Sequence, residues 1–284
     1  MIKDKVRVNL VTGGAGFIGS HIIDSLMLSG EIVVCLDNLS NGNLSNIKKW
    51  LNNENFIYEK FDICNEYNKN VDRIWHFAGL ASPKKYLQDP VLTIKECFLG
   101  TYNMLELARK CNARILLSSS SEIYGDNTSE MINEKNNGNV NCFSERACYA
   151  EGKRISETLF FNYKNSYEVD IRIARIFNTY GPRLSVEDGR VIPYFIHQIF
   201  NNKPIKIYGD GNQTRCFCYI TDMVNALRAL MNSLYDEPIN LGSDREISIN
   251  DLALLISKKL DKPLKSYSFE KLEGDPIYRK PSIQ

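Results

Sequence analysis

The chain of 284 residues carries 35 basic and 34 acidic side chains, and its net charge of +1 gives no electrostatic reason to expect a nucleic-acid partner. A hydrophobic content of 43% and a charged content of 24% are typical of a globular protein that buries a sizeable core. No stretch approaches the roughly 18 apolar residues that a membrane span needs, and the N-terminal stretch lacks the apolar segment of a signal peptide. We therefore expect a cytoplasmic protein without membrane contact.

The sequence predicts an α/β fold from alternating strand and helix patterns. Short apolar stretches rich in β-branched residues predict strands within 6–13, 31–37, 55–63, 73–79, 114–120 and 170–178. Helix-period apolar faces predict helices within 17–30, 101–111 and 147–166. Repeated βα units imply a doubly wound, Rossmann-like parallel sheet in residues 1–180. Beyond it, shorter elements interrupted by prolines predict a smaller C-terminal α/β domain in 181–284, from which some segments return to the first domain.

The eight cysteines are scattered through these elements without paired metal-ligand spacing. Cys216 and Cys218 lie two apart, but no second pair accompanies them. We expect reduced, packed cysteines and no metal site.

A glycine-rich stretch between the first strand and the first helix predicts a dinucleotide site. Gly13, Gly16 and Gly19 permit a tight turn and a close approach of pyrophosphate to the backbone, while the helix N-terminus attracts the anion. Asp37 ends the second strand, where its carboxylate can accept hydrogen bonds from the adenosine ribose and repel a 2′-phosphate. This favours NAD over NADP. Asp62, which ends the third strand, is a plausible adenine contact.

A second polar cluster follows the predicted strand 114–120. The stretch "ILLSSSSEIYG" (115–125) opens from a buried strand into serines and a glutamate at its carboxyl end, where doubly wound sheets bind ligands. The next helix places Tyr149 four residues before Lys153. Spacing alone does not distinguish an acid/base pair from ordinary helical neighbours, because Tyr267 and Lys271 have the same separation.

The ordered glycine triplet, Ser-rich strand end and Tyr-x-x-x-Lys motif resemble the extended short-chain dehydrogenase/reductase superfamily. The resemblance implies that Tyr149 is the base for a sugar hydroxyl, that Lys153 binds the nicotinamide ribose and lowers the pKa of Tyr149, and that Ser120 hydrogen-bonds the reacting oxygen. It extends the NAD site beyond the residues derived above, to Ala15, Phe17, Ile18, Asn38, Ser40, Asn41, Gly42, Ile63, Ala78 and Thr179.

The stretches "SERACYAEGKR", "RIARIFNTYGPR", "YGDGNQTRCFCYITD" and "YRKPSI" are similar to the UDP-glucuronate decarboxylase subgroup. This similarity implies C4 oxidation of UDP-glucuronate, loss of CO₂ and C4 re-reduction to UDP-xylose. Ser121 and Glu122 would assist at the sugar ring. The related dehydratases carry Asp at the position of Ser121 as the acid that protonates the leaving water, and a serine cannot donate a proton in that way. The implied substrate-binding residues are Ser82, Tyr86, Asn178, Arg190, Arg215 and Arg279, the last also as a catalytic residue.

The same resemblance implies a homodimer that pairs the helices within 101–111 and 147–166. Phe160, Phe161 and Tyr163 are more apolar than a solvated helix face requires. The sequence departs from the subgroup at "ECFLGT" (96–101), where Glu96 and Cys97 replace Thr and Asn, and at "HFAGLASP" (76–83).

Two alternatives remain open at this point. A UDP-hexose 4-epimerase, or another enzyme that oxidises C4 of a nucleotide sugar, shares the NAD, Tyr and Lys features. A non-enzymatic NAD(H)-binding sensor or scaffold on the same fold would bind the cofactor without turnover.

Overall fold

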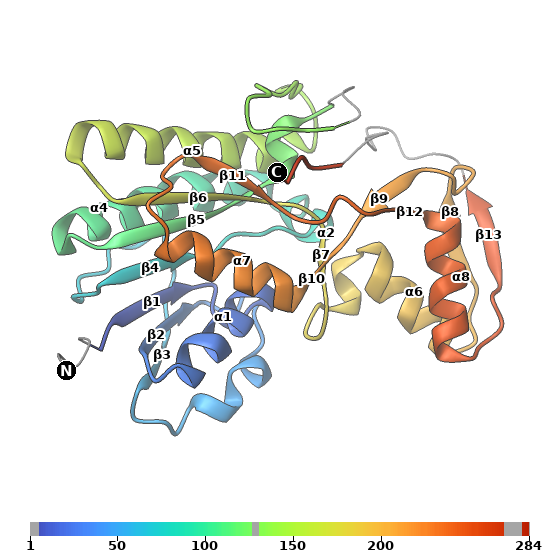
Figure 1. Cartoon of the computed structure of the whole chain (residues 1–284), viewed down its shortest axis with the longest axis horizontal. Coiled ribbons are helices and arrows are strands. Elements are labelled where there is room, and N and C mark those ends of the chain that lie inside the picture. The colour runs from blue at the N-terminus through green and yellow to red at the C-terminus, as the bar shows by residue number, and fades with distance from the viewer. Residues whose placement is uncertain (1–5, 127–130, 270–279, 284) are drawn as a thin grey trace.

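The computed structural model describes residues 6–126, 131–269 and 280–283, and its centre is one parallel sheet (Figure 1). The order of the seven strands across the sheet is β11-β6-β5-β4-β1-β2-β3. They are β1 (Val8–Thr12), β2 (Ile32–Asp37), β3 (Phe56–Lys60), β4 (Arg73–His76), β5 (Arg114–Ser120), β6 (Ile171–Ile176) and β11 (Pro238–Leu241). The predicted doubly wound, Rossmann-like fold is confirmed. Because all strands run parallel, their carboxyl ends meet at one edge.

Helices cover both faces of the sheet, which explains why its strands are apolar on both sides. On one face, α1 (Phe17–Leu28) and α7 (Ile220–Asn232) pack into a core with β1 and β2. On the other face, α4 (Thr101–Cys111) and α5 (Ala147–Tyr167) pack with β4, β5 and β6. The helix α3 (Pro90–Lys95) runs into α4 through a π-helical turn, η3 (Glu96–Gly100).

A smaller unit lies beside the carboxyl edge of the sheet (Figure 1). Its own core joins α6 (Val191–Phe200), α8 (Ile249–Leu260) and the strand β8 (Ile205–Tyr208). Its strand pairs are β8 with β13 (Ser266–Phe269), β9 (Thr214–Cys216) with β12 (Glu246–Ser248), and β10 (Cys218–Tyr219) with β7 (Thr179–Tyr180). The remaining short helices are η1 (Leu44–Asn46), η2 (Lys48–Trp50), α2 (Pro83–Tyr86), η4 (Ser121–Tyr124) and η5 (Val186–Asp188). Although α7 and β11 follow residue 181 in sequence, they pack into the larger sheet.

All eight cysteines have free thiols. Cys35, Cys97, Cys148, Cys216 and Cys218 are buried, as expected for packing residues. The expectation is wrong for Cys142, which is exposed in the loop before α5. Among the helices that the structure describes, none combines the length and apolarity required to cross a membrane.

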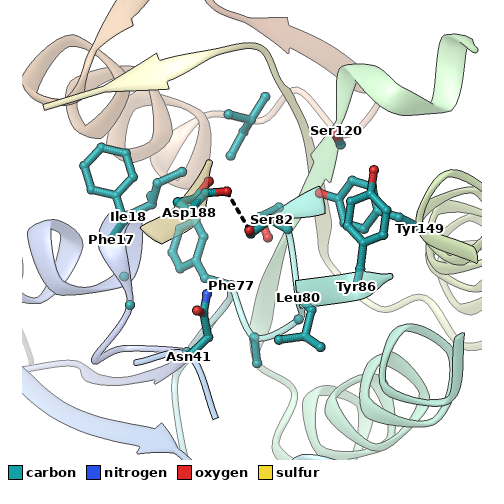
Figure 2. Close-up of a pocket in the computed structure, with 18 of the residues that line it drawn as sticks. Phe17, Ile18, Asn41, Phe77, Leu80, Ser82, Tyr86, Ser120, Tyr149 and Asp188 are labelled. Atoms are coloured by element: carbon teal, nitrogen blue, oxygen red, sulfur yellow. Dashed lines mark hydrogen bonds between the residues drawn. The ribbon is translucent and has the colours of Figure 1, made fainter. Parts of the chain in front are cut away.

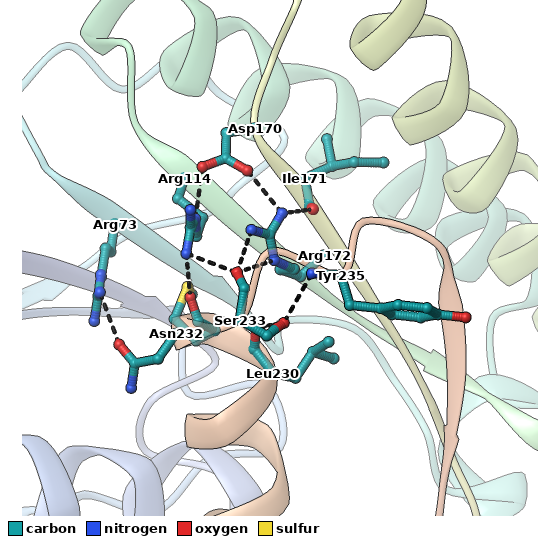
Figure 3. Close-up of polar contacts among 10 residues, drawn as sticks. Arg73, Arg114, Asp170, Ile171, Arg172, Leu230, Asn232, Ser233 and Tyr235 are labelled. Carbon is teal, nitrogen blue, oxygen red and sulfur yellow. Dashed lines mark hydrogen bonds and ion pairs between the residues drawn. The ribbon is translucent and has the colours of Figure 1, made fainter. Parts of the chain in front are cut away.

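Two arginines, one of them buried, tie the end of α7 to the sheet (Figure 3). Arg172 on β6 is 1% exposed, and its Nη2 donates to the carbonyl oxygen of Ser233 at 2.5 Å. Its Nη1 pairs with Asp170 at 2.7 Å. Arg114 on β5 donates to the carbonyl oxygens of Met231 and Ser233 at 2.8 and 3.1 Å. These cations satisfy carbonyl groups at the C-terminus of α7, where the helix dipole also favours positive charge.

Replacing Arg172 by Met should destabilise the protein by about 1 to 3 kcal/mol, because the carbonyl oxygen of Ser233 loses one of its two arginine donors and Asp170 loses an ion-pair partner. Urea unfolding followed by circular dichroism measures this change. Arg73→Met is the control, since Arg73 makes one hydrogen bond with the exposed Asn232 and its loss should cost less than about 1 kcal/mol. Equal stabilities of Arg172→Met and the parent protein would contradict this role.

Candidate functional site

A cavity of about 350 Å³ lies at the carboxyl edge of the sheet, where the smaller unit faces it (Figure 2). Most residues predicted for cofactor, substrate or chemistry line this one cavity. The predicted cofactor residues in its wall are Gly13, Gly16, Phe17, Ile18, Gly19, Asp37, Asn38, Ser40, Asn41, Gly42, Ile63, Ala78, Tyr149, Lys153 and Thr179. The other predicted residues in its wall are Ser82, Tyr86, Ser120, Ser121, Glu122, Asn178, Arg190 and Arg215.

Close backbone contacts account for the glycines of the first turn. Gly13 has φ of +66°, and a Cβ there would lie 2.8 Å from the backbone nitrogen of Ala78. A Cβ at Gly19 would lie 2.3 Å from the carbonyl oxygen of Gly13. The helix α1 then begins at Phe17 with no acidic side chain in its first turn. Its N-terminal amide groups and positive dipole end therefore remain suited to an anion such as pyrophosphate.

Asp37 is fixed at the end of β2 by two backbone donors. Its Oδ2 accepts from the amide of Ala15 at 2.9 Å, and its Oδ1 accepts from the amide of Leu39 at 2.8 Å. Burial raises the pKa of Asp37, and these two hydrogen bonds oppose that shift. Ala15 itself does not line the cavity, so its observed contact is with Asp37 through the backbone. The remaining lone pairs of Asp37 face a cavity that can admit ribose hydroxyls.

The predicted adenine contact Asp62 also stays out of the cavity wall. Its Oδ1 accepts from the amide of Cys64 at 2.9 Å, which turns the chain after β3. The neighbouring side chains Phe61 and Ile63 line the cavity instead.

Tyr149 and Lys153 lie buried on α5 beside the end of β5. Lys153 Nζ donates to the carbonyl oxygen of Ser118 at 2.9 Å and lies 5.9 Å from the centre of the Tyr149 ring. Ser120, at the end of β5, lines the same cavity wall as Tyr149. Burial raises the pKa of Tyr149, whereas the hydroxyl of Ser120 and the positive charge of Arg190 lower it. Burial lowers the pKa of Lys153. The arrangement places a phenol, a hydroxyl and an ammonium group at one end of the cavity.

Tyr86 lines the same end of the cavity and stacks on Tyr149 (Figure 2). Its ring lies parallel to that of Tyr149, with 5.0 Å between the centroids and an angle of 4° between the planes. The ring of Tyr86 thus forms a flat apolar wall against Tyr149.

The smaller unit adds cationic and polar groups. Arg190, at the start of α6, donates to the carbonyl oxygen of Ala81 at 3.2 Å and pairs with Asp188 at 3.1 Å. The Oγ of Ser82 donates to the carbonyl oxygen of Asp188 at 2.9 Å (Figure 2). Arg215 lies on β9 and donates to the carbonyl oxygen of Thr214 at 2.8 Å. Arg279 and Lys271 lie outside the described residues.

Sequence reasoning missed three charged residues in the cavity wall: Glu96, Arg146 and Asp188. Arg146 Nη2 lies 3.3 Å from each carboxylate oxygen of Glu122. Glu96 is buried on η3, where burial and the negative charges of Asp62 and Asp89 raise its pKa. The departure at "ECFLGT" was the available signal for Glu96, but a local pattern does not show which way its side chain points.

A family model described as "NAD dependent epimerase/dehydratase family" matches residues 9–242. The chain belongs to the NAD dependent epimerase/dehydratase family. UDP-glucuronic acid decarboxylase 1 of Xenopus tropicalis is 43% identical over 282 residues, which are 99% of this chain and 67% of that protein. UDP-glucuronic acid decarboxylase 6 of Arabidopsis thaliana is 44% identical over 96% of this chain and 80% of that protein. UDP-glucuronic acid decarboxylase 4 of the same plant is 44% identical, and the chain spans 64% of its length.

Solved structures of epimerases in this family share the fold. The UDP-N-acetylglucosamine 4-epimerase of Methanobrevibacter ruminantium, in complex with UDP-N-acetylmuramic acid, aligns with a TM-score of 0.90 at 30% identity, over 98% of this chain and 90% of that chain. The Thermus thermophilus UDP-glucose 4-epimerase complex with NAD aligns with a TM-score of 0.84 at 26% identity, over 97% and 90% of the two chains. The family and the glycine turn therefore agree on a dinucleotide as the first ligand to test.

Gly42→Ala should weaken NADH binding about tenfold, or by about 1.4 kcal/mol. A Cβ at Gly42 would lie 2.7 and 2.8 Å from the carboxylate oxygens of Asp37, which backbone hydrogen bonds hold in place. Fluorescence titration with NADH measures the affinity. In an Asp37→Ala background, Gly42→Ala should have no further effect, because the group it displaces is already gone. Additive losses in the double variant would show that Asp37 is not the cause.

Proposed function

We propose that the protein converts UDP-glucuronate to UDP-xylose by NAD-dependent decarboxylation. The observation that carries this proposal is that Ser121 and Glu122 line the same cavity as Tyr149 and Lys153, directly after Ser120. The decarboxylases at 43% and 44% identity over nearly all of this chain support the same assignment.

The cavity wall fits NAD. The N-terminus of α1 would bind the pyrophosphate, Asp37 the adenosine ribose and Lys153 the nicotinamide ribose. The bound cofactor would accept a hydride from C4 of the sugar and later return it. The carboxylate of Asp37 disfavours the 2′-phosphate of NADP by charge repulsion.

The residues around Tyr149 would manage the protons and the charge. Tyr149, as the phenolate, takes the proton of the C4 hydroxyl while Ser120 hydrogen-bonds the same oxygen. The resulting 4-keto group makes the C6 carboxylate part of a β-keto acid. The C5–C6 bond then breaks, CO₂ leaves, and the electron pair moves into a C4–C5 enolate that Tyr149 and Ser120 stabilise as donors. A proton added at C5, with Ser121 or Glu122 assisting through water, and reduction at C4 complete UDP-xylose.

The anionic groups of the substrate account for the arginines at the entrance from the smaller unit. Arg190 and Arg215 would bind the nucleotide diphosphate or the sugar carboxylate, since guanidinium groups pair with two oxygens at once. Ser82, Tyr86 and Asn178 would line the sugar and its approach. Arg279 is proposed for the carboxylate on the family resemblance alone.

We further propose a homodimer formed by the outer faces of α4 and α5, with a second copy of the chain as the partner. Two residues named for this face, Phe160 and Tyr163, are instead buried in the protein's own core against α4 and the sheet. The exposed apolar side chains on η3, α4 and α5 are Phe98, Tyr102, Ile155, Phe161 and Tyr167. Exposed apolar side chains of this size favour self-association.

Phe161→Asp should shift the protein from dimer to monomer, because it buries a charge in the proposed interface. Sedimentation equilibrium at micromolar concentration measures the mass. Phe200→Asp on α6 is the matched control, since Phe200 is 62% exposed and Phe161 is 61% exposed. A parent protein that sediments as a monomer, or two variants with the same mass as a dimeric parent, would contradict this interface.

The function is tested by incubating the protein with UDP-glucuronate and NAD and measuring CO₂ release and the mass of the nucleotide-sugar product. We expect CO₂ and UDP-xylose, and Tyr149→Phe should lower turnover by about 10² to 10⁴ while it retains NADH binding, because only the proton-transfer group is lost. Conversion of UDP-glucose to UDP-galactose without CO₂ from UDP-glucuronate would instead indicate an epimerase. Cofactor binding without either turnover would favour the non-enzymatic alternative.

A further inference from the structure

Arg146 stands at an unusual place for a cation. It is the N-cap residue of α5, a helix of 21 residues with no acidic residue in its first turn and no side-chain cap hydrogen bond. A positive charge at a helix N-terminus faces the positive end of the helix dipole, which disfavours it. The stability of α5 therefore does not explain why an arginine lies there.

The contacts of Arg146 are with groups in the cavity. Its Nη2 lies 3.3 Å from both oxygens of Glu122, so it bridges the two ends of the carboxylate. Arg146 and Tyr86 both line the cavity, and Arg146 lowers the pKa of Tyr86, which burial raises. The Tyr86 ring stacks on Tyr149. The contact of Arg146 with Glu122 therefore lies in the same cavity wall as the aromatic stack beside the proposed sugar site.

The groups proposed for C4 oxidation have other supports. The ammonium group of Lys153 donates to the carbonyl oxygen of Ser118, and the Tyr149 ring packs on Tyr86. Neither contact involves Arg146. Loss of Arg146 should therefore leave the proton-transfer set in place while it removes the ion pair that Arg146 makes with Glu122.

We propose that Arg146 is a positioning residue that holds Glu122 against the sugar, so that loss of CO₂ depends on Arg146 more strongly than C4 oxidation does. This role rests on the proposed function. In the step concerned, the C5–C6 bond breaks, its electron pair enters the C4–C5 enolate, CO₂ leaves, and a proton is then added at C5. A carboxylate that is fixed beside C5 orients the ring and the proton-donating water for these changes.

Arg146→Met tests this role with UDP-glucuronate as the substrate. We expect CO₂ release at saturating substrate to fall at least about tenfold, while the NADH dissociation constant stays within about twofold and the NADH absorbance that reports C4 oxidation still rises. Arg146→Lys should recover part of the rate because it restores the positive charge but not the planar guanidinium group. It also keeps the test decisive if Arg146→Met does not fold.

Arg154→Met is the matched control on the same helix. Arg154 and Arg146 have side chains that are both 38% exposed, but Arg154 binds the carbonyl oxygens of Ile123 and Asn137 and is not in the cavity wall. We expect CO₂ release by Arg154→Met to stay within about twofold of the parent. An equal loss in both variants would overturn the assignment, since it would reflect the stability of α5.

A double-mutant cycle separates positioning from a general structural effect. In a Glu122→Gln background, Arg146→Met should cost less than about twofold, because the residue it acts through is already impaired. Independent, multiplicative losses would overturn the role of Arg146, as would an Arg146→Met enzyme with parental CO₂ release. A parent protein that releases no CO₂ would overturn the proposed function and this role together. If the parent protein releases CO₂ and Arg146→Met releases it at the same rate, only the role of Arg146 is overturned.

Discussion

The buried ammonium group of Lys153 constrains the geometry of the whole site. A cation that is buried away from water needs polar partners to offset the cost of losing its hydration. Here the carbonyl oxygen of Ser118 accepts a hydrogen bond from Lys153 Nζ at 2.9 Å. Since Ser118 is on β5 and Lys153 is on α5, this contact fixes the helix against the strand. The same contact sets Tyr149, one turn earlier on α5, beside Ser120 at the strand end. The catalytic proposal depends on this single alignment of helix and strand.

A second set of cations holds α7 against the larger sheet. Arg114 and Arg172 hold the C-terminal carbonyl groups of α7 against β5 and β6. Through α7 and β11, the chain returns to the sheet between the segments that build the smaller unit. This double connection keeps Arg190 and Arg215 facing the carboxyl edge. Residues of both units therefore line the cavity, and the chain crosses between the units more than once.

Charge is distributed unevenly along the cavity. Asp37 marks the end suited to the adenosine ribose, and the amide groups of α1 offer positive potential beside it. Arg146, Arg190 and Arg215 gather where a sugar and its diphosphate would lie. Glu122 and Asp188 offset two of these cations through ion pairs. An anionic substrate would compete for guanidinium groups that are only partly engaged, which favours binding without leaving buried charges unpaired.

The sequence by itself determined six of the seven strands of the parallel sheet and the helices α1, α4 and α5, because hydrophobic periodicity and the glycines between elements are local signals. It did not predict β11 or α7, which join this sheet from later in the chain. It also identified the glycine turn, Asp37, Ser120, Tyr149 and Lys153 as candidates, since each lies at a strand end or on a helix face that periodicity can place. It could not show that Ala15 and Asp62, which were predicted to bind the cofactor, do not line the cavity. A shift of one residue along the chain decides which way a side chain points.

Contacts between distant elements were decided only by the tertiary structure. The packing of α4 against α5 buried Phe160 and Tyr163, which sequence analysis had assigned to an exposed face. The approach of α5 to η4 brought Arg146 to Glu122, 24 residues away in sequence. Neither partner carries a local signal for the other, because an ion pair across two elements depends on how those elements pack and not on the residues beside it.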